Sequence, residues 1–385
     1  MRIAVVTAIP TPYRDPFWGR VNAIGGVELD VFYCAAGKPD RPWQVDWPRD
    51  FNYFEMPSWN LARFRGADAS AYWVPGLQAK LRRGSYDAAI IGGYNHPCML
   101  ASMRTCRKRG VPFFLVCETH RVASQGRFNP RRSFVRWICR LATGGLPTGT
   151  LATRFLEAHG LPEDKTIRMP NVPDTTSWTA EVGMLRRSGT GLHDKLGVSD
   201  GDRIVTFVGR MIPKKRPDLL IRAFAEVDIR DSVLVLIGDG PLLAQCRELA
   251  ASLGVADRVR FPGFCARSEI QEWFAVSRLF ALPSTETWGV AGIEALASGL
   301  RVILSDGVGS HPDVVRNPSD GWVVPAGQVA PLVEALRAGL AGDFDPAGVV
   351  AEAAHLRSEF QYDVLSGRLV DGLRRISGVA RSTEL

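Results

Sequence analysis

The sequence predicts an α/β protein with two domains and mainly parallel sheets. Apolar β-strand patterns alternate with helical patterns from end to end, and this order is typical of parallel sheets covered by helices. The length of 385 residues favours two domains over one. A hydrophobic content of 46% is enough to fill two cores.

The N-terminal domain is expected over residues 1–172. Its predicted strands are four apolar runs: Arg2–Thr7, Leu29–Tyr33, Ala88–Ile91 and Val111–Val116. The proline-rich stretch Met169–Asp174 and the polar residues after it predict a hinge over 173–202, where packing falls away. The C-terminal domain is then expected over 203–360, and a final helix within 361–385.

The C-terminal domain opens with a strand and a basic loop. A β-branched apolar run ends at Gly209, and a helix is predicted to begin at Pro217, because proline suits a first helical turn. The loop between them carries four basic residues: Arg210, Lys214, Lys215 and Arg216. Side chains at the carboxyl end of a strand lie where α/β folds bind ligands, so the loop suits an anionic group. A solvated loop is the alternative.

Two carboxylates, Glu286 and Glu294, follow the apolar strand Leu279–Pro283 with seven residues between them. A helix that contains Glu294 is predicted to start between them, and its first turn would offer backbone N–H groups to a phosphate. These groups belong to Trp288, Gly289 and Val290. The arrangement suits one extended, hydroxyl-rich ligand such as a nucleotide-sugar better than a single metal ion. The alternative is that Glu294 is a surface residue and Glu286 a charge favoured by the helix dipole.

Both segments resemble signatures of the retaining glycosyltransferases of family 4, the glycosyl transferases of group 1. Ser284–Gly299 is similar to the Glu-x7-Glu signature of that family, and Gly209–Lys215 to its Gly-Arg-x4-Lys motif. The resemblance implies the GT-B architecture, in which two Rossmann-like domains with parallel sheets face each other across a cleft. It also implies that a C-terminal helix, within 361–385, packs back on the N-terminal domain.

The resemblance also implies roles for these residues. In the family, the first glutamate binds hydroxyls of the donor sugar and the second binds the nucleotide ribose, which are the roles of Glu286 and Glu294. The Arg and Lys of the other motif neutralise the donor pyrophosphate. Arg210 and Lys215 inherit this role, and Lys214 is the neighbouring candidate.

A glycine turn and a later aromatic residue are candidates for the base pocket. Val233–Ile237 reads as a buried strand that closes on Gly238, and Phe264 ends the later run Phe261-Pro-Gly-Phe. The family places its nucleotide near both, although any strand-to-helix turn favours glycine. Asp313, where the family commonly has Glu, is interpreted as structural.

The N-terminal domain should supply the acceptor site. His120 follows a predicted buried strand, and the family often has a histidine there that contacts the transferred sugar; a polar loop residue is the alternative. Glu118, on the same strand end, is a further candidate. Many members carry a Gly-Gly loop after the first strand, whereas this chain has prolines at 10, 12 and 16, which puts the backbone phosphate contacts of that loop in question. Tyr13 and Arg14 of this loop are expected to face acceptor or pyrophosphate.

Charge is distributed unevenly along the chain. Residues 1–170 carry 24 Lys/Arg and 13 Asp/Glu, a net charge of +11, whereas the remainder carries −4. A basic amphipathic helix is predicted near Arg131–Leu141, with its arginines and its apolar residues on different faces. The arginine face holds Arg132, Arg136 and Arg140, and the apolar face holds Phe134, Trp137, Ile138 and Leu141. The region 127–141 could contact an anionic membrane or an anionic acceptor; a core-facing helix with a solvated outer face is the alternative. No base-stacking motif points to nucleic acid.

Several functional classes are not favoured by the sequence. Seven cysteines without a Cys-x-x-Cys pair predict neither a disulfide framework nor a zinc site. No apolar run is long enough for a membrane span, and the first strand is too short for a signal peptide, so a cytoplasmic location is expected, with peripheral membrane contact left open. Asp200-Gly-Asp202 matches a metal-binding Asp-x-Asp string of another glycosyltransferase fold, but a polar turn explains it. No metal or other cofactor is expected.

The function predicted from these residues and the resemblance is a metal-independent, retaining glycosyltransferase. It would move a sugar from a nucleoside-diphosphate donor to an acceptor hydroxyl. Three alternatives stay open: a nucleotide-sugar epimerase or hydrolase of the same fold, a non-catalytic sugar-nucleotide-binding scaffold, and a dehydrogenase, which lacks support because no Gly-x-Gly-x-x-Gly follows the first strand. The sequence does not define the sugar, the base or the acceptor.

Overall fold

A computed structural model of the chain describes residues 1–37, 48–62, 71–119, 130–189, 191–227 and 229–379. The chain divides into two compact units. Unit 1 comprises Met1–Val172 and Tyr362–Leu385, and unit 2 comprises Pro173–Gln361. Each unit contains a six-stranded parallel sheet, which confirms the predicted α/β class with two Rossmann-like parallel-sheet domains.

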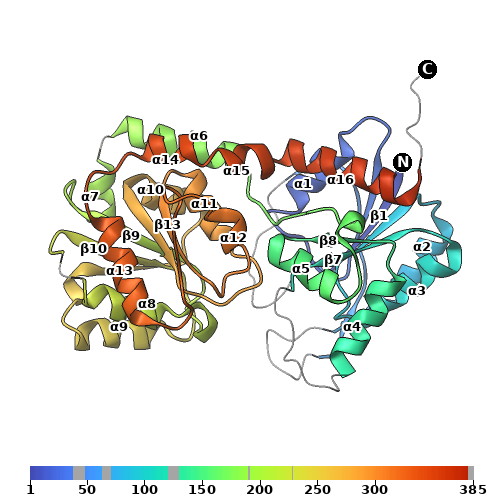
Figure 1. Cartoon of the computed structure of the whole chain (residues 1–385), viewed down its shortest axis with the longest axis horizontal. Helices are drawn as coiled ribbons and strands as arrows, with labels where there is room; N and C mark the ends of the chain where they lie inside the picture. Colours follow the sequence, from blue (N-terminus) through green and yellow to red (C-terminus); the bar gives the residue numbers. More distant parts are fainter. Residues whose placement is uncertain (38–47, 63–70, 120–129, 190, 228, 380–385) are drawn as a thin grey trace. The chain divides into compact units, whose positions relative to one another are not determined.

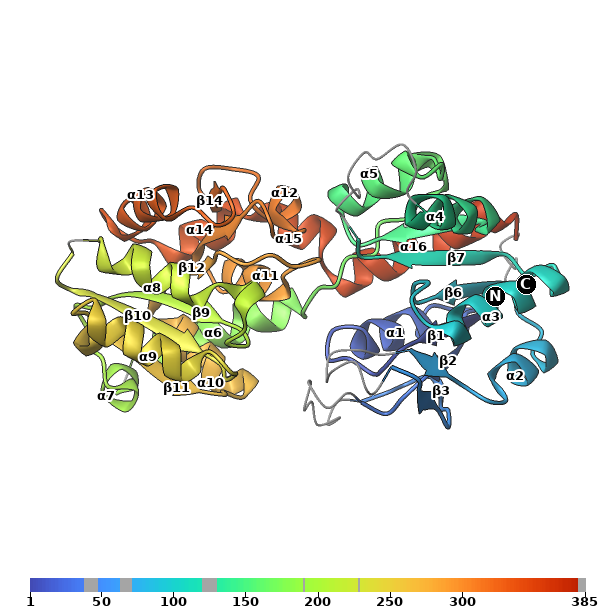
Figure 2. The same ribbon diagram turned by 90° about the horizontal axis from the view of Figure 1, so that it is seen from below.

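Unit 1 is built on the sheet β3-β2-β1-β6-β7-β8, and Figure 2 shows most of its strands side by side in this order. The strands are β1 (Arg2–Thr7), β2 (Glu28–Tyr33), β3 (Asn52–Glu55), β6 (Ala88–Ile91), β7 (Phe113–Cys117) and β8 (Gly144–Pro147). A short antiparallel ribbon pairs β4 (Trp59–Asn60) with β5 (Tyr72–Trp73). The helices are α1 (Asp15–Asn22), α2 (Leu77–Arg83), α3 (Pro97–Arg109), α4 (Pro130–Leu141), α5 (Thr150–Ala158) and α16 (Tyr362–Ser377).

Unit 2 is built on the sheet β11-β10-β9-β12-β13-β14. The strands are β9 (Arg203–Val208), β10 (Ser232–Ile237), β11 (Val259–Gly263), β12 (Ser277–Leu282), β13 (Arg301–Ser305) and β14 (Gly321–Val324). The helices are α6 (Thr175–Ser188), α7 (Leu192–Leu196), α8 (Pro217–Ala225), α9 (Leu243–Ser252), α10 (Arg267–Val276), α11 (Val290–Ala297), α12 (His311–Val314), α13 (Val329–Leu340), α14 (Pro346–Glu352) and α15 (Ala354–Glu359). Figure 1 shows α8, α9 and α13 on one face of this sheet and α6, α10 and α11 on the other.

The central strands are continuous apolar runs because helices cover both faces of each sheet. Every residue of β6 and of β10 is buried. The predicted bounds of β1 and β6 agree with the structure, and those of β2, β7, β10 and β12 differ by one or two residues. Helix α8 begins at Pro217, as predicted.

The C-terminal helix returns to unit 1, as predicted. Helix α16 packs on α1, and Phe17 of α1 lies 6.2 Å from Tyr362 between ring centroids. The Tyr362 hydroxyl also donates a hydrogen bond to the carbonyl of Val172 at 3.2 Å.

The segment expected to be a hinge, 173–202, differs from that expectation. It contains α6, which packs on α10 and α11 and belongs to unit 2. Asp174 caps α6 by accepting a hydrogen bond from the Ser177 N–H at 3.0 Å, and Trp178 and Val182 of this helix are buried. Residues 175–188 therefore form a packed, half-polar amphipathic helix rather than a loose linker.

Candidate functional site

The site in unit 2 lies at the carboxyl ends of β9 and β12. These strands are neighbours in the middle of the sheet, but β9 leads to β10 on one side and β12 to β13 on the other. The chain therefore leaves the two strand ends in opposite directions, which is where open α/β sheets form their ligand crevice. The basic loop follows β9, and the first glutamate of the signature follows β12.

Lys215 and Glu286 form an ion pair across this point. The Lys215 Nζ donates hydrogen bonds to Oε1 and Oε2 of Glu286, both at 2.7 Å. Only 15% of the lysine side chain and 16% of the glutamate side chain are exposed. A short 3-10 turn, Pro213–Lys215, aims Lys215 inward and leaves Lys214 exposed. The ion pair thus distinguishes Lys215 from Lys214. The motif had favoured Lys215 only because of its spacing from Arg210.

Glu286 is held in its ionised form. Burial opposes ionisation, but the Lys215 ammonium and the hydrogen bonds from Lys215 and Ser284 outweigh it, so the pKa of Glu286 is held below its ordinary value. The Ser284 hydroxyl donates to Glu286 Oε1 at 2.5 Å. An ionised carboxylate of this kind accepts hydrogen bonds from sugar hydroxyls rather than donating a proton.

The backbone around Glu286 is fixed by the loop that follows β13. The Glu286 N–H donates to the carbonyl of Gly307 at 3.1 Å, and the Gly309 N–H donates to the carbonyl of Glu286 at 2.9 Å. The Thr285 N–H binds the carbonyl of Lys214 at 2.8 Å, which ties the β12 loop to the basic loop. Glu286 therefore sits on a pre-formed support.

Helix α11 begins beside this pair, as predicted. Gly289 is its N-cap, with a φ of +99°, and a Cβ there would lie 2.7 Å from Cγ1 of Val308, so the tight entry requires glycine. Val290 starts the helix, whose first backbone N–H groups and positive dipole end favour an anion. The Trp288 side chain is buried and its ring lies 6.4 Å from that of Phe360, so it anchors the loop in the core.

Glu294 lies within α11 in a less polar environment than Glu286. Its residue is half-buried, and burial raises the pKa of Glu294 to about 7 against the opposing charge of Arg267. This is not the environment of a solvated surface residue. The two glutamates of the signature thus differ in charge state near neutral pH.

The remaining donor-side candidates lie at neighbouring strand ends. Arg210 follows β9 and is exposed. Gly238 follows β10, and a Cβ there would lie 2.0 Å from the carbonyl oxygen of Gly209. Its glycine is therefore required by the close approach of two backbones of the protein, with a φ of +134°, whether or not a ligand binds. Phe264, after β11, is 71% exposed.

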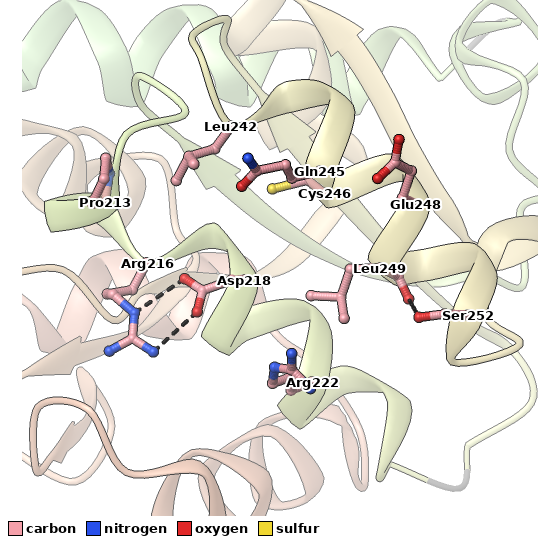
Figure 3. Close-up of a pocket in the computed structure, with 10 residues that line it drawn as sticks. All are labelled: Pro213, Arg216, Asp218, Arg222, Leu242, Gln245, Cys246, Glu248, Leu249 and Ser252. Atoms are coloured by element: carbon pink, nitrogen blue, oxygen red, sulfur yellow. Dashed lines mark hydrogen bonds and ion pairs between the residues drawn. The ribbon is translucent and has the colours of Figure 1, made fainter.

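A cavity of about 550 Å³ lies between α8 and α9 (Figure 3). It contains the bidentate pair of Arg216 with Asp218, whose two hydrogen bonds are both 3.0 Å long. Arg216 has a φ of +53°, a left-handed conformation that is uncommon outside glycine. Arg216, the last basic residue of the loop after β9, lines this cavity, whereas Lys215 and Glu286 do not.

Unit 1 brings three acceptor-side candidates together at the carboxyl end of its sheet. Arg14 is half-buried and donates a hydrogen bond to the carbonyl of Met169 at 3.2 Å. Burial lowers the pKa of Arg14, while the charges of Glu118 and Tyr13 oppose that effect. Glu118 is exposed and accepts a hydrogen bond from Asn171 Nδ2 at 2.9 Å. His120 lies outside the described residues.

Helix α4 differs from the prediction in which residues face the core. The buried residues are Val135, Ile138 and Cys139. Phe134 and Trp137, predicted on the same face as Ile138, are 38% and 53% exposed. The buried stripe is narrower than the apolar set of the helix, so the two aromatic rings lie on its exposed surface.

The arginines of α4 flank these rings. Arg131, Arg136 and Arg140 are exposed, and Arg132 is half-buried. Residues 127–129 of the region named above lie outside the described residues.

The Asp200–Asp202 turn is used for local contacts. Asp202 accepts a hydrogen bond from the Ser199 N–H at 2.7 Å, and Asp200 pairs with His193 at 2.9 Å. Across the described residues, no group of three or more His, Cys, Asp or Glu side chains is arranged to hold a metal ion. Among the same residues, no helix is long and apolar enough to cross a membrane. Asp313 is buried in α12.

Two contributors to the site were missed by the sequence analysis. Ser284 is fully buried and orients Glu286; its place at the strand end, two residues before the carboxylate, was the available signal. Arg267, at the start of α10, acts on Glu294 from 27 positions away in the chain, and no local pattern indicates this.

Residues 190–353 match the model of the family described as Glycosyl transferases group 1. The match includes the basic loop, Glu286 and Glu294. Over this stretch the chain is similar to the group 1 glycosyltransferases. The resemblance predicted from the sequence is confirmed over these residues.

Curated relatives agree with this result. The chain is 34% identical over 208 residues to a D-inositol 3-phosphate glycosyltransferase of Nocardia farcinica. The matched segment covers 51% of this chain and 44% of the relative. It is 32% identical over 182 residues to a GDP-mannose-dependent alpha-(1-6)-phosphatidylinositol monomannoside mannosyltransferase of Mycobacterium tuberculosis, covering 44% of this chain and 47% of the relative. The matched segment thus spans less than half the length of these curated relatives.

Solved structures resemble both units. Anabaena HepE in complex with UDP and glucose has a TM-score of 0.70 and 17% identity, covering 97% of this chain and 100% of that chain. A glycosyltransferase from Rickettsia africae has a TM-score of 0.73 and 16% identity, covering 98% and 99%. At such identities the likeness shows the fold, and it confirms the predicted GT-B class. The cleft between the two units stays a prediction.

Proposed function

We propose that this chain is a retaining glycosyltransferase that moves a sugar from a nucleoside-diphosphate donor to an acceptor hydroxyl. The observation that carries the proposal is the Lys215–Glu286 ion pair at the switch point of the unit 2 sheet, beside the N-terminus of α11. A cation, an ionised carboxylate and a helix N-terminus within one strand-end crevice match the pyrophosphate and the hydroxyl groups of such a donor.

The donor is bound by groups of opposite kind along its length. Lys215, Arg210 and the first N–H groups of α11 bind the pyrophosphate, and Glu286 accepts hydrogen bonds from sugar hydroxyls. Glu294 accepts hydrogen bonds from the ribose, a role that favours its ionised form. Phe264, which is exposed after β11, offers a flat apolar face to the base.

The transfer step relies on charge already placed at the leaving group. The acceptor oxygen bonds to the anomeric carbon as the bond from that carbon to the phosphate oxygen breaks. The departing diphosphate gains negative charge, which Arg210, Lys215 and the α11 N–H groups stabilise. In front-side attack, the acceptor proton passes to an oxygen of that diphosphate, and the anomeric configuration is retained. His120 and Glu286 hold the sugar during this step.

Metal independence follows from the same charges. Two side-chain cations and a helix dipole can neutralise a pyrophosphate without a divalent ion. Transfer is therefore expected to persist in excess chelator, and a loss of activity that added Mg²⁺ restores would contradict this part of the proposal.

The acceptor is assigned to unit 1 and is expected to be anionic or lipid-linked. Residues 1–170 carry a net charge of +11, and Tyr13, Arg14 and Glu118 meet at the carboxyl end of the sheet. The exposed rings of Phe134 and Trp137 beside the α4 arginines suit contact with an anionic membrane surface. The names of the relatives suggest a first acceptor panel of inositol phosphates and phosphatidylinositol mannosides.

The test is incubation of the chain with UDP-, GDP-, ADP- and dTDP-sugars, with and without the acceptor panel. Release of nucleoside diphosphate that rises only with acceptor supports transfer. Release without acceptor would favour the epimerase or hydrolase alternative. Binding without turnover for every combination would favour the scaffold alternative.

A further inference from the structure

Helix α6 is joined to the C-terminal end of α11 by side-chain hydrogen bonds. The Thr179 hydroxyl shares its one proton between the carbonyl of Ala297 at 2.7 Å and that of Thr175, in its own helix, at 2.9 Å. The Arg186 guanidinium donates to the carbonyl of Ser298. Arg186 also donates to the carbonyls of Phe274 at 2.9 Å and Ala275 at 3.1 Å, at the end of α10. One helix thus binds the last carbonyls of two others.

These carbonyls need such partners. The last four carbonyls of a helix have no partner within it, and its negative dipole end favours a cation. In α11 the carbonyls of Glu294, Ala295 and Leu296 accept hydrogen bonds from the N–H groups of the three residues after the helix. The carbonyl of Ala297 takes the Thr179 hydroxyl instead. Burial lowers the pKa of Arg186 to about 10, which leaves the side chain cationic at neutral pH.

Polar contacts add to the packing of α6 on this end of α11, which adjoins a cavity. A cavity of about 240 Å³ is lined by residues of α6, of the end of α11, and of α14 and α15. Thr179 and Ala297 both line it. Interiors transmit position best where they are close-packed, so beside this cavity the Thr179 contact strengthens the restraint on the end of α11.

Glu294 belongs to the same last turn of α11. The Ser298 N–H donates to the carbonyl of Glu294 at 3.0 Å, so the residue that binds Arg186 through its carbonyl binds Glu294 through its amide. Movement of this turn moves the Glu294 carboxylate directly.

We propose that Thr179 and Arg186 are positioning residues that hold Glu294 in place for the donor. The inference rests on the proposed function, because it assigns Glu294 to donor binding. It also links donor affinity to α6, the first helix after the chain leaves unit 1 at Val172.

The primary test is Thr179→Val, which removes the hydroxyl that donates the hydrogen bond and keeps the shape of the side chain. Arg186→Met removes several hydrogen bonds and can unfold α6, so Arg186→Lys, which retains the cation, serves as the second variant. The control is Arg187→Met, which changes an exposed arginine of the same helix. KM for the donor and kcat are measured for each, alone and combined with Glu294→Gln.

We expect Thr179→Val to raise the donor KM about three- to tenfold, with kcat within about twofold, because one hydrogen bond is lost. In the Glu294→Gln background the same change should have no further effect, since both act through one carboxylate. Arg186→Lys should fall between wild type and Thr179→Val, and Arg187→Met should match wild type.

Additive effects of Thr179→Val and Glu294→Gln, or an unchanged KM, would overturn the positioning role while leaving the proposed function in place. A wild-type chain that neither binds nor turns over any nucleotide-sugar would overturn both together.

Discussion

The two signature glutamates have opposite environments at the residue scale. Glu286 is paired with Lys215 and hydrogen-bonded by Ser284, whereas Glu294 is half-buried with only the more distant charge of Arg267 acting on it. The contacts with Lys215 and Ser284 therefore keep Glu286 ionised despite its burial, whereas burial makes Glu294 a group that titrates near neutral pH. The neighbouring residues therefore give the two glutamates different charge states near neutral pH.

Glu294 should make stability depend on pH. Its folded-state pKa of about 7 is above the ordinary 4.5, so its contribution to stability is fully present below pH 4.5 and is lost as pH rises through 7. Glu294→Gln, which stays neutral, should be more stable than wild type at pH 8, by up to about 3 kcal/mol, and similar at pH 4.5.

Thermal unfolding of unit 2 followed from pH 4.5 to 8 measures this difference. Glu334→Gln, on the exposed face of α13, is the control and should show no such trend. A constant difference between Glu294→Gln and wild type across this range would contradict the buried environment of Glu294.

Gly238 makes a separate prediction at the residue scale. Gly238→Ala places a Cβ within 2.0 Å of the Gly209 carbonyl oxygen at a φ of +134°, so unit 2 should lose roughly 3 kcal/mol or more of its stability. Chemical denaturation checks this. Gly201→Ala, where nothing lies near the added methyl group, is the control. A stable Gly238→Ala chain that only loses donor binding would show that the glycine serves the ligand instead.

At the scale of elements, α4 presents two exposed aromatic rings beside arginines. Trp137→Ser should weaken flotation of the chain with anionic vesicles at low salt, and high salt should weaken flotation of the wild type, because both apolar and electrostatic terms contribute. Met184→Ser, at an exposed apolar position of α6 in unit 2, is the control. Equal flotation of Trp137→Ser and wild type would contradict membrane contact and would indicate that the outer face of α4 is only solvated.

Strand and loop chemistry explain which elements the sequence could predict. The buried parallel strands are long apolar runs, and proline marked the start of α8. Strand β8 was missed because Gly144, Gly145 and Pro147 usually break strands; here a Cβ on Gly144 would lie 2.7 Å from both Phe114 and the Lys165 carbonyl. Helix α6 was missed because its packing partners, α10 and α11, are distant in sequence.

The same limit applies to the candidate site. Motif spacing identified Lys215 and Glu286 before their ion pair was visible, since both lie at strand ends that the topology makes neighbours. Motif spacing could not identify Arg186 or Arg267, because their contacts with α11 form only when helices distant in sequence pack together. It also could not show that Phe134 and Trp137 are exposed.

At the scale of the whole molecule, unit 2 is continuous in sequence and unit 1 is not. Residues 173–361 should therefore fold by themselves and bind nucleoside diphosphate but not transfer sugar. Residues 1–172 lack α16, which packs on α1, and should be unstable alone. Circular dichroism and calorimetry of the two fragments measure this. A stable 1–172 fragment with a melting temperature equal to that of unit 1 in the full chain would contradict the role of α16.

The central claim is that Lys215, rather than its neighbour Lys214, binds the donor pyrophosphate at the β9–β12 switch point. Calorimetric titration of the nucleoside diphosphate into wild type, Lys215→Ala and Lys214→Ala tests it most directly. Lys215→Ala should lose about 100-fold or more in affinity, since it removes a charge-assisted contact and leaves Glu286 to repel the ligand, while Lys214→Ala should lose less than about threefold. Equal losses in the two variants, or wild-type affinity in Lys215→Ala, would contradict the account.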